Sequence, residues 1–490
     1  MIPAASSWNT AAASYLTGMG TVPVVLLTIG KTSLSDTGGY ARILSSYKTG
    51  VANQYAWLRL EGAKLTQSVS DLDASSNLSN LTLTCTDGDL LHPQALTGDI
   101  NGGYTFGGQT AILWVGWSTI AQSDFVQLAT MILDHTDYGN DNTTLDFVIR
   151  DNTLLINNYA FITAQNGLAT CDQNPATVMG RPFDPAQGLA VTALIDADLP
   201  TGLINAAAIS YLDQNIYFDF NMLFAVTYPP SAKDWIETEV LKPLGCCWFW
   251  NYLGQWTPYS LLPAVPPVSV LTLDQTNIAA ATLPVPVESE MYTSALTYRM
   301  DMDSNGQNAQ TIFTDIYAPA ANLYGISQTR VIISRGVRSS LGGLRMAHLM
   351  ANMIFRRYGL KPLTLQVETF APGILVEMGE KITINHHLIP NGKFPAPLRN
   401  AGTLLGVNGT LWEVTRKTID LAKMTATFEL LDVSWELAVY PDGTQTGAWY
   451  IAPDATKQFA AESAPNQRKY MYVCNSSDQY STGAAAHTLW

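Results

Sequence analysis

One segment, residues 329–432, combines a long helical pattern with strand patterns on both sides, and this combination limits the folds available to the chain. In residues 344–358 apolar side chains recur at spacings of three and four, which places them on one face of a helix. Gly359 and Pro362 end the pattern. We therefore predict a long helix over 341–359. Because its opposite face is also largely apolar, this helix needs two packing partners.

Short runs that alternate apolar and polar residues flank the helix, as expected for a sheet with one face in water. Gly379 stands just before one run, where a turn takes a positive φ without steric cost. We expect the helix to pack on an antiparallel sheet formed by these runs. They lie at 329–334, 363–369, 381–384, 409–415 and 424–431.

The first 155 residues have the pattern of a separate β domain, with glycine-marked turns between apolar runs. Cys85 stands in one of these runs and is expected to be a small core residue. The strand candidates lie in 22–29, 56–60, 81–89 with a turn at Asp87 and Gly88, 107–117, 123–128 and 145–151.

The middle of the chain has a different pattern. A strand is predicted at 215–220, followed by a helix over 231–244 that ends at Gly245. An apolar hairpin with a turn near Leu253 and Gly254 comes next. Two proline-rich segments, which we interpret as semi-rigid connectors, follow at 263–267 and 284–286.

Four tryptophans gather in this helix and hairpin: Trp235, Trp248, Trp250 and Trp256. Aromatic residues at this density in an apolar hairpin favour core or interface positions. A platform for carbohydrate binding is the alternative interpretation.

Composition excludes some classes of protein. Charged residues make up only 13% of the chain and hydrophobic residues 47%, which is not a disordered composition. It fits both β-rich proteins that assemble and secreted β proteins. The formal net charge of −14 argues against nucleic-acid binding, which needs basic surfaces. The apolar run at 22–29 contains Pro23 and lacks a preceding basic region, so we predict neither a signal peptide nor a membrane span.

Motifs for catalysis are missing from the sequence. The six histidines show no paired-ligand spacing, and neither a nucleophile elbow nor a phosphate-binding loop occurs. We therefore predict no enzyme, no catalytic residue and no cofactor-binding residue. The five cysteines are scattered without the C-x-x-C spacing of metal sites.

The run LVEMGEKITI at 375–384, followed after a loop by GTLWEVTRKTIDLAKMTATFELLDVS at 409–434, resembles the second tube-like domain of tailed-phage tail hub proteins. These are relatives of the spike-base proteins of contractile tails and of type VI secretion. The strand succession up to Arg150 and Asp151 resembles their first tube-like domain.

The resemblance implies a mainly β fold with α+β parts: two tube-like split β-barrel domains, an inserted helix-and-hairpin module and an extended C-terminal arm. The boundaries would be 1–155, 156–287, 288–438 and 439–490, in the order first domain, module, second domain and arm. A terminus without fixed packing is an equally good interpretation of the last segment.

The function that the resemblance implies is structural. Three copies would adapt a six-fold tail tube or distal tail ring to a three-fold tail tip that carries a fibre or spike. They would line part of the DNA channel without binding DNA specifically. The location would be the tail tip of a virion that is assembled in the bacterial cytoplasm. The negative charge would then repel passing phosphates, although it also fits simple solubility.

The family also suggests where to look for sites. Some tail hubs are thought to carry an iron–sulfur cluster, for which Cys246, Cys247 and Cys474 are the candidates here, although the spacing of that pattern is not met. We otherwise expect no cofactor and no metal. The interface candidates are Trp248, Trp250, Trp256, Tyr470, Tyr472 and Trp490.

Two other functions remain open at this point. A distal tail ring protein would form a hexamer and contain one tube-like domain. A secreted carbohydrate-binding or carbohydrate-cleaving β protein would be a monomer whose tryptophans contact sugar.

Overall fold

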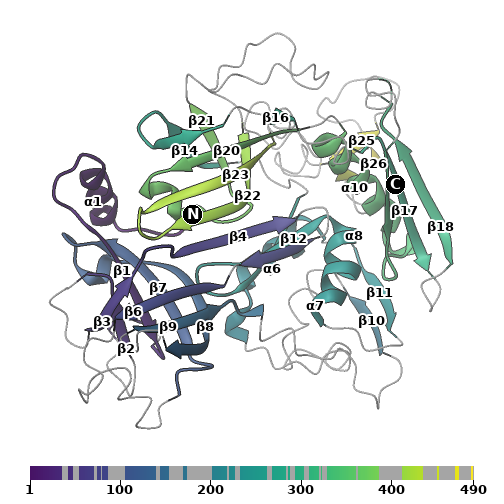
Figure 1. Cartoon of the computed structure of the whole chain (residues 1–490). Helices are drawn as coiled ribbons and strands as arrows, with labels where there is room; N and C mark the ends of the chain where they lie inside the picture. Colours follow the sequence, from purple (N-terminus) through teal and green to yellow (C-terminus); the bar gives the residue numbers. More distant parts are fainter. Residues whose placement is uncertain are drawn as a thin grey trace.

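The computed structural model has a mainly β fold with several helices, as predicted (Figure 1). It describes residues 1–31, 33–35, 42–47, 54–70, 74–78, 80–86, 105–138, 144–153, 169–173, 201–217, 220–226, 232–261, 268–282, 285–286, 293–302, 308–318, 322, 328–359, 362–385, 411–433, 450–451, 470–473 and 487–488.

Seven strands of the N-terminal part form a closed barrel in the order β1-β2-β3-β6-β9-β8-β7. Closure comes from β1 and β7, which pair antiparallel from Pro23 opposite Trp117 to Ile29 opposite Ala111. Pro23 is the first residue of its strand, where its missing N–H is tolerated. The strands are β1 (Pro23–Ile29), β2 (Arg42–Ser45), β3 (Gln54–Arg59), β6 (Leu81–Thr86), β7 (Thr110–Trp117), β8 (Val126–Tyr138) and β9 (Thr144–Arg150).

All seven barrel strands contribute buried side chains to one apolar cluster, as only the interior of a barrel permits. Cys85 is one of them and is a core residue, as expected. Helix α1 (Ser6–Leu16), which the sequence analysis missed, adds Trp8, whose ring centroid lies 5.7 Å from that of Trp117. The short helix η1 (Gln122–Asp124) precedes β8.

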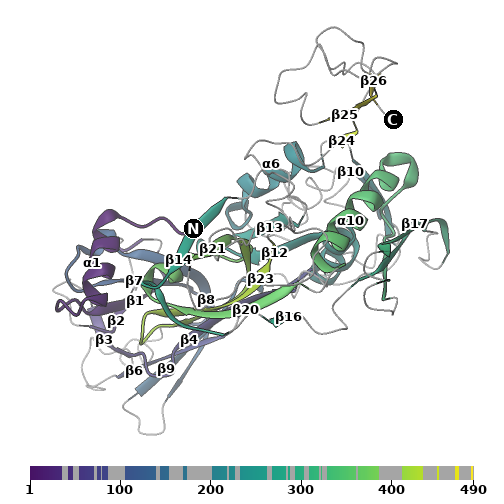
Figure 2. The ribbon, with the colours of Figure 1, turned by 90° about the horizontal axis from the view of Figure 1, so that it is seen from above.

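A second sheet of nine strands lies beside the barrel (Figures 1 and 2). Its central path is β14-β21-β22-β23-β20-β15, with β16 paired to β20, and η6 (Ala371–Leu375) connects β20 to β21. The strands are β14 (Ser269–Asp274), β15 (Ile278–Ala281), β16 (Val285–Pro286), β20 (Leu363–Thr369), β21 (Lys381–Asn385), β22 (Leu411–Asp420) and β23 (Thr425–Asp432).

The remaining two strands of this sheet come from the N-terminal part of the chain. β4 (Lys64–Ser70) leaves the barrel after β3 and pairs with the second half of β22, from Lys64 opposite Asp420 to Ser68 opposite Arg416. β5 (Ser75–Leu78) pairs with β4. The barrel segment and the C-terminal segment therefore share one sheet.

A separate core contains the middle of the chain and a three-stranded sheet in the order β18-β17-β19. Two hairpin strands, two further strands and several helices complete it. The elements are η2 (Thr201–Leu203), α6 (Ala206–Asn215), α7 (Ala232–Trp235), the π-helix η3 (Ile236–Leu241), α8 (Lys242–Leu244), η5 (Ser339–Leu341), α10 (Gly343–Tyr358), β10 (Ala169–Gln173), β11 (Met222–Val226), β12 (Cys246–Trp250), β13 (Trp256–Ser260), β17 (Ala295–Met302), β18 (Ala309–Ile316) and β19 (Thr329–Ile333).

Three local predictions need correction. Asn215 ends helix α6, and Ile216 and Tyr217 form a buried turn rather than a strand, because the helix satisfies the backbone up to Ile216. The long helix α10 packs its apolar face on β17–β19 and the middle module, not on the sheet of β20–β23. β17 and β19 therefore belong to a sheet of their own.

Helix α10 does have two packing partners, as its sequence requires. Most of its buried residues join the middle core, whereas Tyr358 at its end contacts Leu431 of β23. The domain boundaries stay a prediction. The connector 263–267 lies outside the described residues, as does most of 439–490. From the latter range β24 (Tyr450–Ile451), β25 (Tyr470–Val473) and β26 (His487–Thr488) are described and form a small sheet.

The turn of the β12–β13 hairpin depends on Gly254. Its φ is +70°, and a Cβ there would lie 2.7 Å from Asn152 Nδ2 and 2.9 Å from the Thr130 carbonyl oxygen. Gly62 has a similar φ of +78° with nothing within 4 Å of the same position. The two glycines therefore differ only in how closely the barrel approaches them.

We expect Gly254→Ala to lower the free energy of unfolding by about 3 kcal/mol, because strain at positive φ adds to a clash with the backbone. Gly62→Ala carries the φ strain alone and should cost about 1 kcal/mol. Urea unfolding of both variants measures the difference, and equal losses would contradict the close approach.

Candidate assembly scaffold at the junction of barrel and second sheet

The tip of the β12–β13 hairpin is held by polar contacts from the barrel. The Tyr252 carbonyl oxygen accepts hydrogen bonds from Thr130 Oγ1 at 3.1 Å and Gln127 Nε2 at 3.3 Å. The Gly254 carbonyl oxygen accepts one from Asn152 Nδ2 at 2.7 Å. These carbonyl oxygens are part-buried or buried. Each hydrogen bond therefore replaces one that the oxygen would otherwise make with water.

The same hairpin also contacts the second sheet. The Tyr252 N–H donates to Glu377 Oε1 at 3.0 Å, and Gln67 Nε2 of β4 donates to the Trp250 carbonyl oxygen at 2.9 Å. Glu377 lies in the turn before β21, where Gly379 has the positive φ that the sequence predicted. The hairpin is thus fixed to the barrel and to the second sheet at once.

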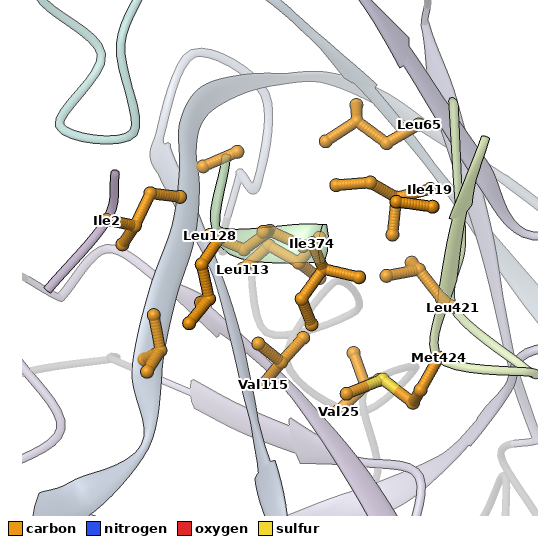
Figure 3. Close-up of a cluster of buried hydrophobic side chains, with 14 of the residues drawn as sticks. Ile2, Val25, Leu65, Leu113, Val115, Leu128, Ile374, Ile419, Leu421 and Met424 are labelled. Carbon is orange, nitrogen blue, oxygen red and sulfur yellow. The ribbon is translucent and has the colours of Figure 1, made fainter. Parts of the chain in front are cut away.

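Apolar side chains fill the space between barrel and second sheet. Leu65 of β4 and Ile374 of η6 belong to the same cluster as the barrel interior, so the two parts have one continuous core. Such a core resists separation, because opening it would expose apolar surface to water. Figure 3 shows Val25, Leu113, Val115 and Leu128 from the barrel beside Ile374, Ile419, Leu421 and Met424 from the second part.

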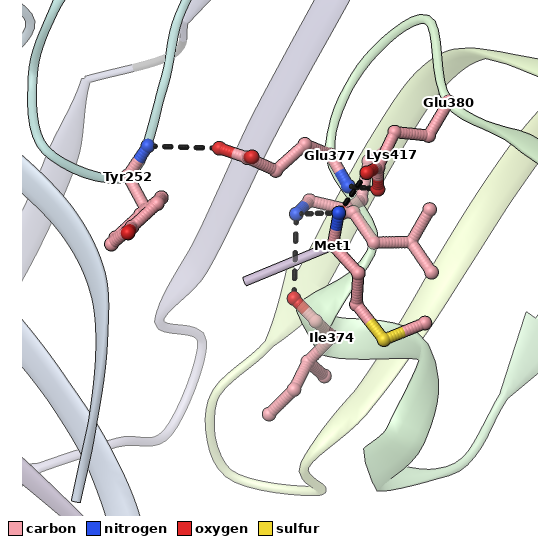
Figure 4. Close-up of polar contacts among 7 residues, drawn as sticks. Met1, Tyr252, Ile374, Glu377, Glu380 and Lys417 are labelled. Carbon is pink, nitrogen blue, oxygen red and sulfur yellow. Dashed lines mark hydrogen bonds and ion pairs between the residues drawn. The ribbon is translucent and has the colours of Figure 1, made fainter. Parts of the chain in front are cut away.

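One buried cation lies at this junction. Lys417 of β22 is 6% exposed, and its Nζ donates to the carbonyl oxygens of Val376 at 2.5 Å and Ile374 at 3.4 Å (Figure 4). Burial lowers the pKa of Lys417 to about 8, while the nearby Glu377 carboxylate acts in the opposite direction. Glu380 accepts from the Glu377 N–H at 2.7 Å and pairs with the amino group of Met1.

A second buried charge joins the two cores. Arg357 of α10 makes a bidentate contact with Glu413 of β22, with N–O distances of 2.6 and 3.1 Å and side chains 0% and 4% exposed. Paired guanidinium and carboxylate groups of this geometry fix position and angle together. This pair therefore sets where the middle module lies against the second sheet.

The tryptophans proposed as interface residues are inside the chain. Trp248, Trp250 and Trp256 are 1%, 4% and 1% exposed, and their rings contact one another with centroids 5.6 and 6.2 Å apart. Trp248 Nε1 donates to Glu237 and Trp250 Nε1 to Thr153, both at 2.9 Å. Their surface role is thereby corrected, because the hairpin directs these tryptophans into the middle core and Phe249 into the core of the barrel and second sheet. These side chains also offer no sugar platform.

The other candidates are placed as follows. Tyr470 and Tyr472 lie in β25, and Trp490 and Cys474 lie outside the described residues. Cys246 and Cys247 are adjacent in β12, where alternation directs their thiols to opposite sides. Cys246 Sγ is 2.8 Å from the Tyr217 hydroxyl, and burial raises the pKa of Cys246 to about 12, which favours the thiol over the metal-binding thiolate.

Within the ranges that the structure describes, no three His, Cys, Asp or Glu side chains are grouped so that they would hold a metal ion. In the same ranges no helix has the length and apolar character needed to cross a membrane. The site joins two β parts and a helical module rigidly through buried contacts. Sequence reasoning missed Lys417 and the Arg357–Glu413 pair, because nothing in a single charged residue reveals its burial.

The stability of the chain should depend on pH through Lys417. Between pH 8 and about 10.5 the unfolded chain keeps the lysine proton that the folded chain has released, so stability rises with pH in this window. Relative to Lys417→Met, which removes the titration, the wild type should gain about 2 kcal/mol between pH 8 and 10. Denaturant unfolding across this range measures it. Lys423→Met, at an exposed position, is the control. If the difference in unfolding free energy between the wild type and Lys417→Met did not change with pH, the prediction would be refuted.

Loss of Glu413 should be costly. Glu413→Gln leaves the buried Arg357 without a charged partner, and we expect a loss of about 3 kcal/mol of unfolding free energy. The control is Glu429→Gln on the neighbouring strand, because the Arg416–Glu429 pair has an N–O distance of 3.1 Å but is about half exposed. That loss should stay below about 1 kcal/mol. If Glu413→Gln and Glu429→Gln lost similar unfolding free energies in thermal and urea unfolding, the stabilising role of the buried Arg357–Glu413 pair would be ruled out.

Comparison by sequence finds no family model and no curated protein that matches the chain. Comparison by structure finds similarity to the 43 kDa tail protein of prophage MuSo2 from Shewanella oneidensis, at 11% identity and a TM-score of 0.44 over 84% of this chain and 99% of that one. A tail protein from Neisseria meningitidis MC58 is similar at 10% identity and a TM-score of 0.44, over 84% and 98%. The prophage tail protein gp18 from Listeria monocytogenes is similar at 9% identity and a TM-score of 0.38, over 84% and 94%.

Proposed function

We propose that the chain is a structural protein of a phage tail or a related particle, and that it forms the trimeric tail hub. Three copies adapt the six-fold tail tube or distal tail ring to a three-fold tip that carries a fibre or central spike. The trimer surrounds part of the DNA channel at the tail tip, after assembly in the bacterial cytoplasm. The role needs no cofactor and no catalytic residue.

The observation that carries this proposal is the rigid pairing of a closed barrel with a second, larger sheet in one chain. β4 belongs to the barrel segment in sequence and to the second sheet in pairing, so the two β parts cannot move apart without breaking its ladder with β22. A subunit that presents two β units at a fixed spacing allows three copies to present six. The sequence resemblance of both parts to tube-like domains supports the same assignment.

The charge balance is compatible with a conduit for DNA. The chain has 40 acidic residues against 26 basic ones, which gives its net charge of −14. Where such a surface lines a channel, it repels the phosphates of passing DNA and prevents adhesion. This sign supports passage of nucleic acid and disfavours its capture.

Solution mass and image symmetry test the proposal. Light scattering should give three times the 53.3 kDa mass of the chain, and averaged electron micrographs should show a three-fold ring with six β lobes around a channel. The ring should persist in 1 M salt if apolar contacts hold it, because salt at this concentration screens exposed charges.

Other stoichiometries have defined meanings. A hexamer with one lobe per chain would indicate a distal tail ring protein instead. A stable monomer at all concentrations, including in mixtures with tail tube protein, would contradict any ring.

A further inference from the structure

Exposed apolar side chains gather on one face of the three-stranded sheet β18-β17-β19. Ile312 and Ile316 of β18 are 59% and 63% exposed, and Val331 and Ile333 of β19 are 45% and 46% exposed. The other face of this sheet is buried in the middle core, with Tyr298 and Met300 of β17 fully covered. The apolar residues on the outer face thus lie outside the core clusters that the described residues form.

The distribution of these residues indicates a neighbour beside the sheet rather than over it. By the strand register, Arg299 of β17 lies between Ile312 and Ile333, and Thr297 lies between Thr314 and Val331. The centre of the face is therefore polar and its two sides are apolar. An interface that covered the whole face would have the opposite pattern, an apolar centre with a polar rim.

β18 has the properties of a strand that accepts another strand. It is eight residues long and contains no proline, and β17 is its sole strand partner among the described residues. Free sheet edges in soluble proteins are usually protected by proline, lysine, bulges or short length. The alternation of exposed and half-buried residues along β18 is regular, which suits the addition of a strand. At its end the Ile316 N–H already donates to Asp315 Oδ1 at 2.8 Å, so the added strand would pair before this residue.

Charge decides against a second copy of β18 as the added strand. Asp315 is the single charged residue of β18, on the side opposite to Ile312 and Ile316. In a two-fold antiparallel pair that places Ile312 opposite Ile316, the two Asp315 side chains become diagonal neighbours, and sliding one strand by two residues places them opposite each other. Like charges directly opposite each other destabilise a strand pair, and diagonal carboxylates gain no attraction. A basic residue opposite Asp315 is favoured instead.

We propose that β18 is a docking edge for an extended segment of another protein, with aliphatic residues at alternate positions and a Lys or Arg opposite Asp315. This inference rests on the proposed hub function in one respect, the direction from which the partner comes. Figures 1 and 2 place β17 at the end of the molecule away from the barrel, with β18 beside it in Figure 1. In a ring built by the barrel and second sheet, this edge points outward, to a peripheral component of the particle.

A designed peptide tests the edge directly. The capped heptapeptide VRVTVTV places valines opposite the exposed side of β18 and arginine opposite Asp315, while VDVTVTV reverses that charge. Hydrogen exchange should show at least about tenfold protection at alternate amides of 309–316 on addition of the arginine peptide, because an added strand forms a new ladder. The aspartate peptide should bind about tenfold more weakly.

Variants of the protein test where the peptide binds. Asp315→Arg should reverse the preference between the two peptides, which a merely adhesive surface would not do. Ile312→Lys should abolish binding, whereas Val268→Lys, at a position 75% exposed elsewhere, should leave it unchanged. Equal binding of both peptides, or no protection of β18 at millimolar peptide, would overturn the proposal.

Three further outcomes bear on the choice of partner and on the hub. Protection of β18 that rises with protein concentration alone would show that a second copy occupies the edge, and would overturn the choice of partner. A three-fold ring whose β18 binds no peptide would leave the hub intact and remove the docking edge. Peptide binding by a protein that forms no ring would retain the docking edge and remove the hub.

Discussion

The pairing of β4 with β22 is the constraint on which the rest of the arrangement depends. Strands β3 and β6 belong to the barrel, and β4 and β5, which lie between them in sequence, belong to the second sheet. The barrel can close only if β6 returns after this excursion, so barrel closure and completion of the second sheet are linked events. Such non-local pairing makes folding slow, but in the finished protein the β4–β22 ladder joins the two parts directly.

Apolar burial and polar contacts have different tasks at this junction. The continuous core stabilises the contact between the two parts but does not set their relative orientation, since the hydrophobic effect depends on buried area and not on angle. The contacts at the hairpin tip and the Arg357–Glu413 pair are directional and select one relative position of the parts. A buried ion pair adds little net stability compared with apolar residues, so its presence here is better explained by the geometry that it fixes.

Local elements were predictable from the sequence and their partners were not. The hairpin turn at Gly254, the stop at Gly245 and the spacing of α10 all follow from short-range sterics and periodicity. Periodicity shows that α10 has an apolar face but not which sheet covers it: the preceding strand β19 does pack on α10, whereas the strands that follow it, β20–β23, were the wrong choice. The Trp248–Trp256 cluster was ambiguous for the same reason, because the two faces of β12 are buried by distant parts of the chain: Phe249 joins the core of the barrel and second sheet, and Trp248 joins the middle core.

The contrast between the two cores bears on how such a chain would join others. The tryptophans of the hairpin, a residue type that often anchors protein interfaces, are buried inside the middle core. What the described surface of the middle module offers instead is β-branched residues on a sheet edge, where recognition comes mainly from backbone hydrogen bonds. Backbone pairing tolerates sequence change in the partner as long as alternation and one charge are kept. An edge of this kind therefore suits a partner whose sequence varies but whose attachment to this protein has to be kept.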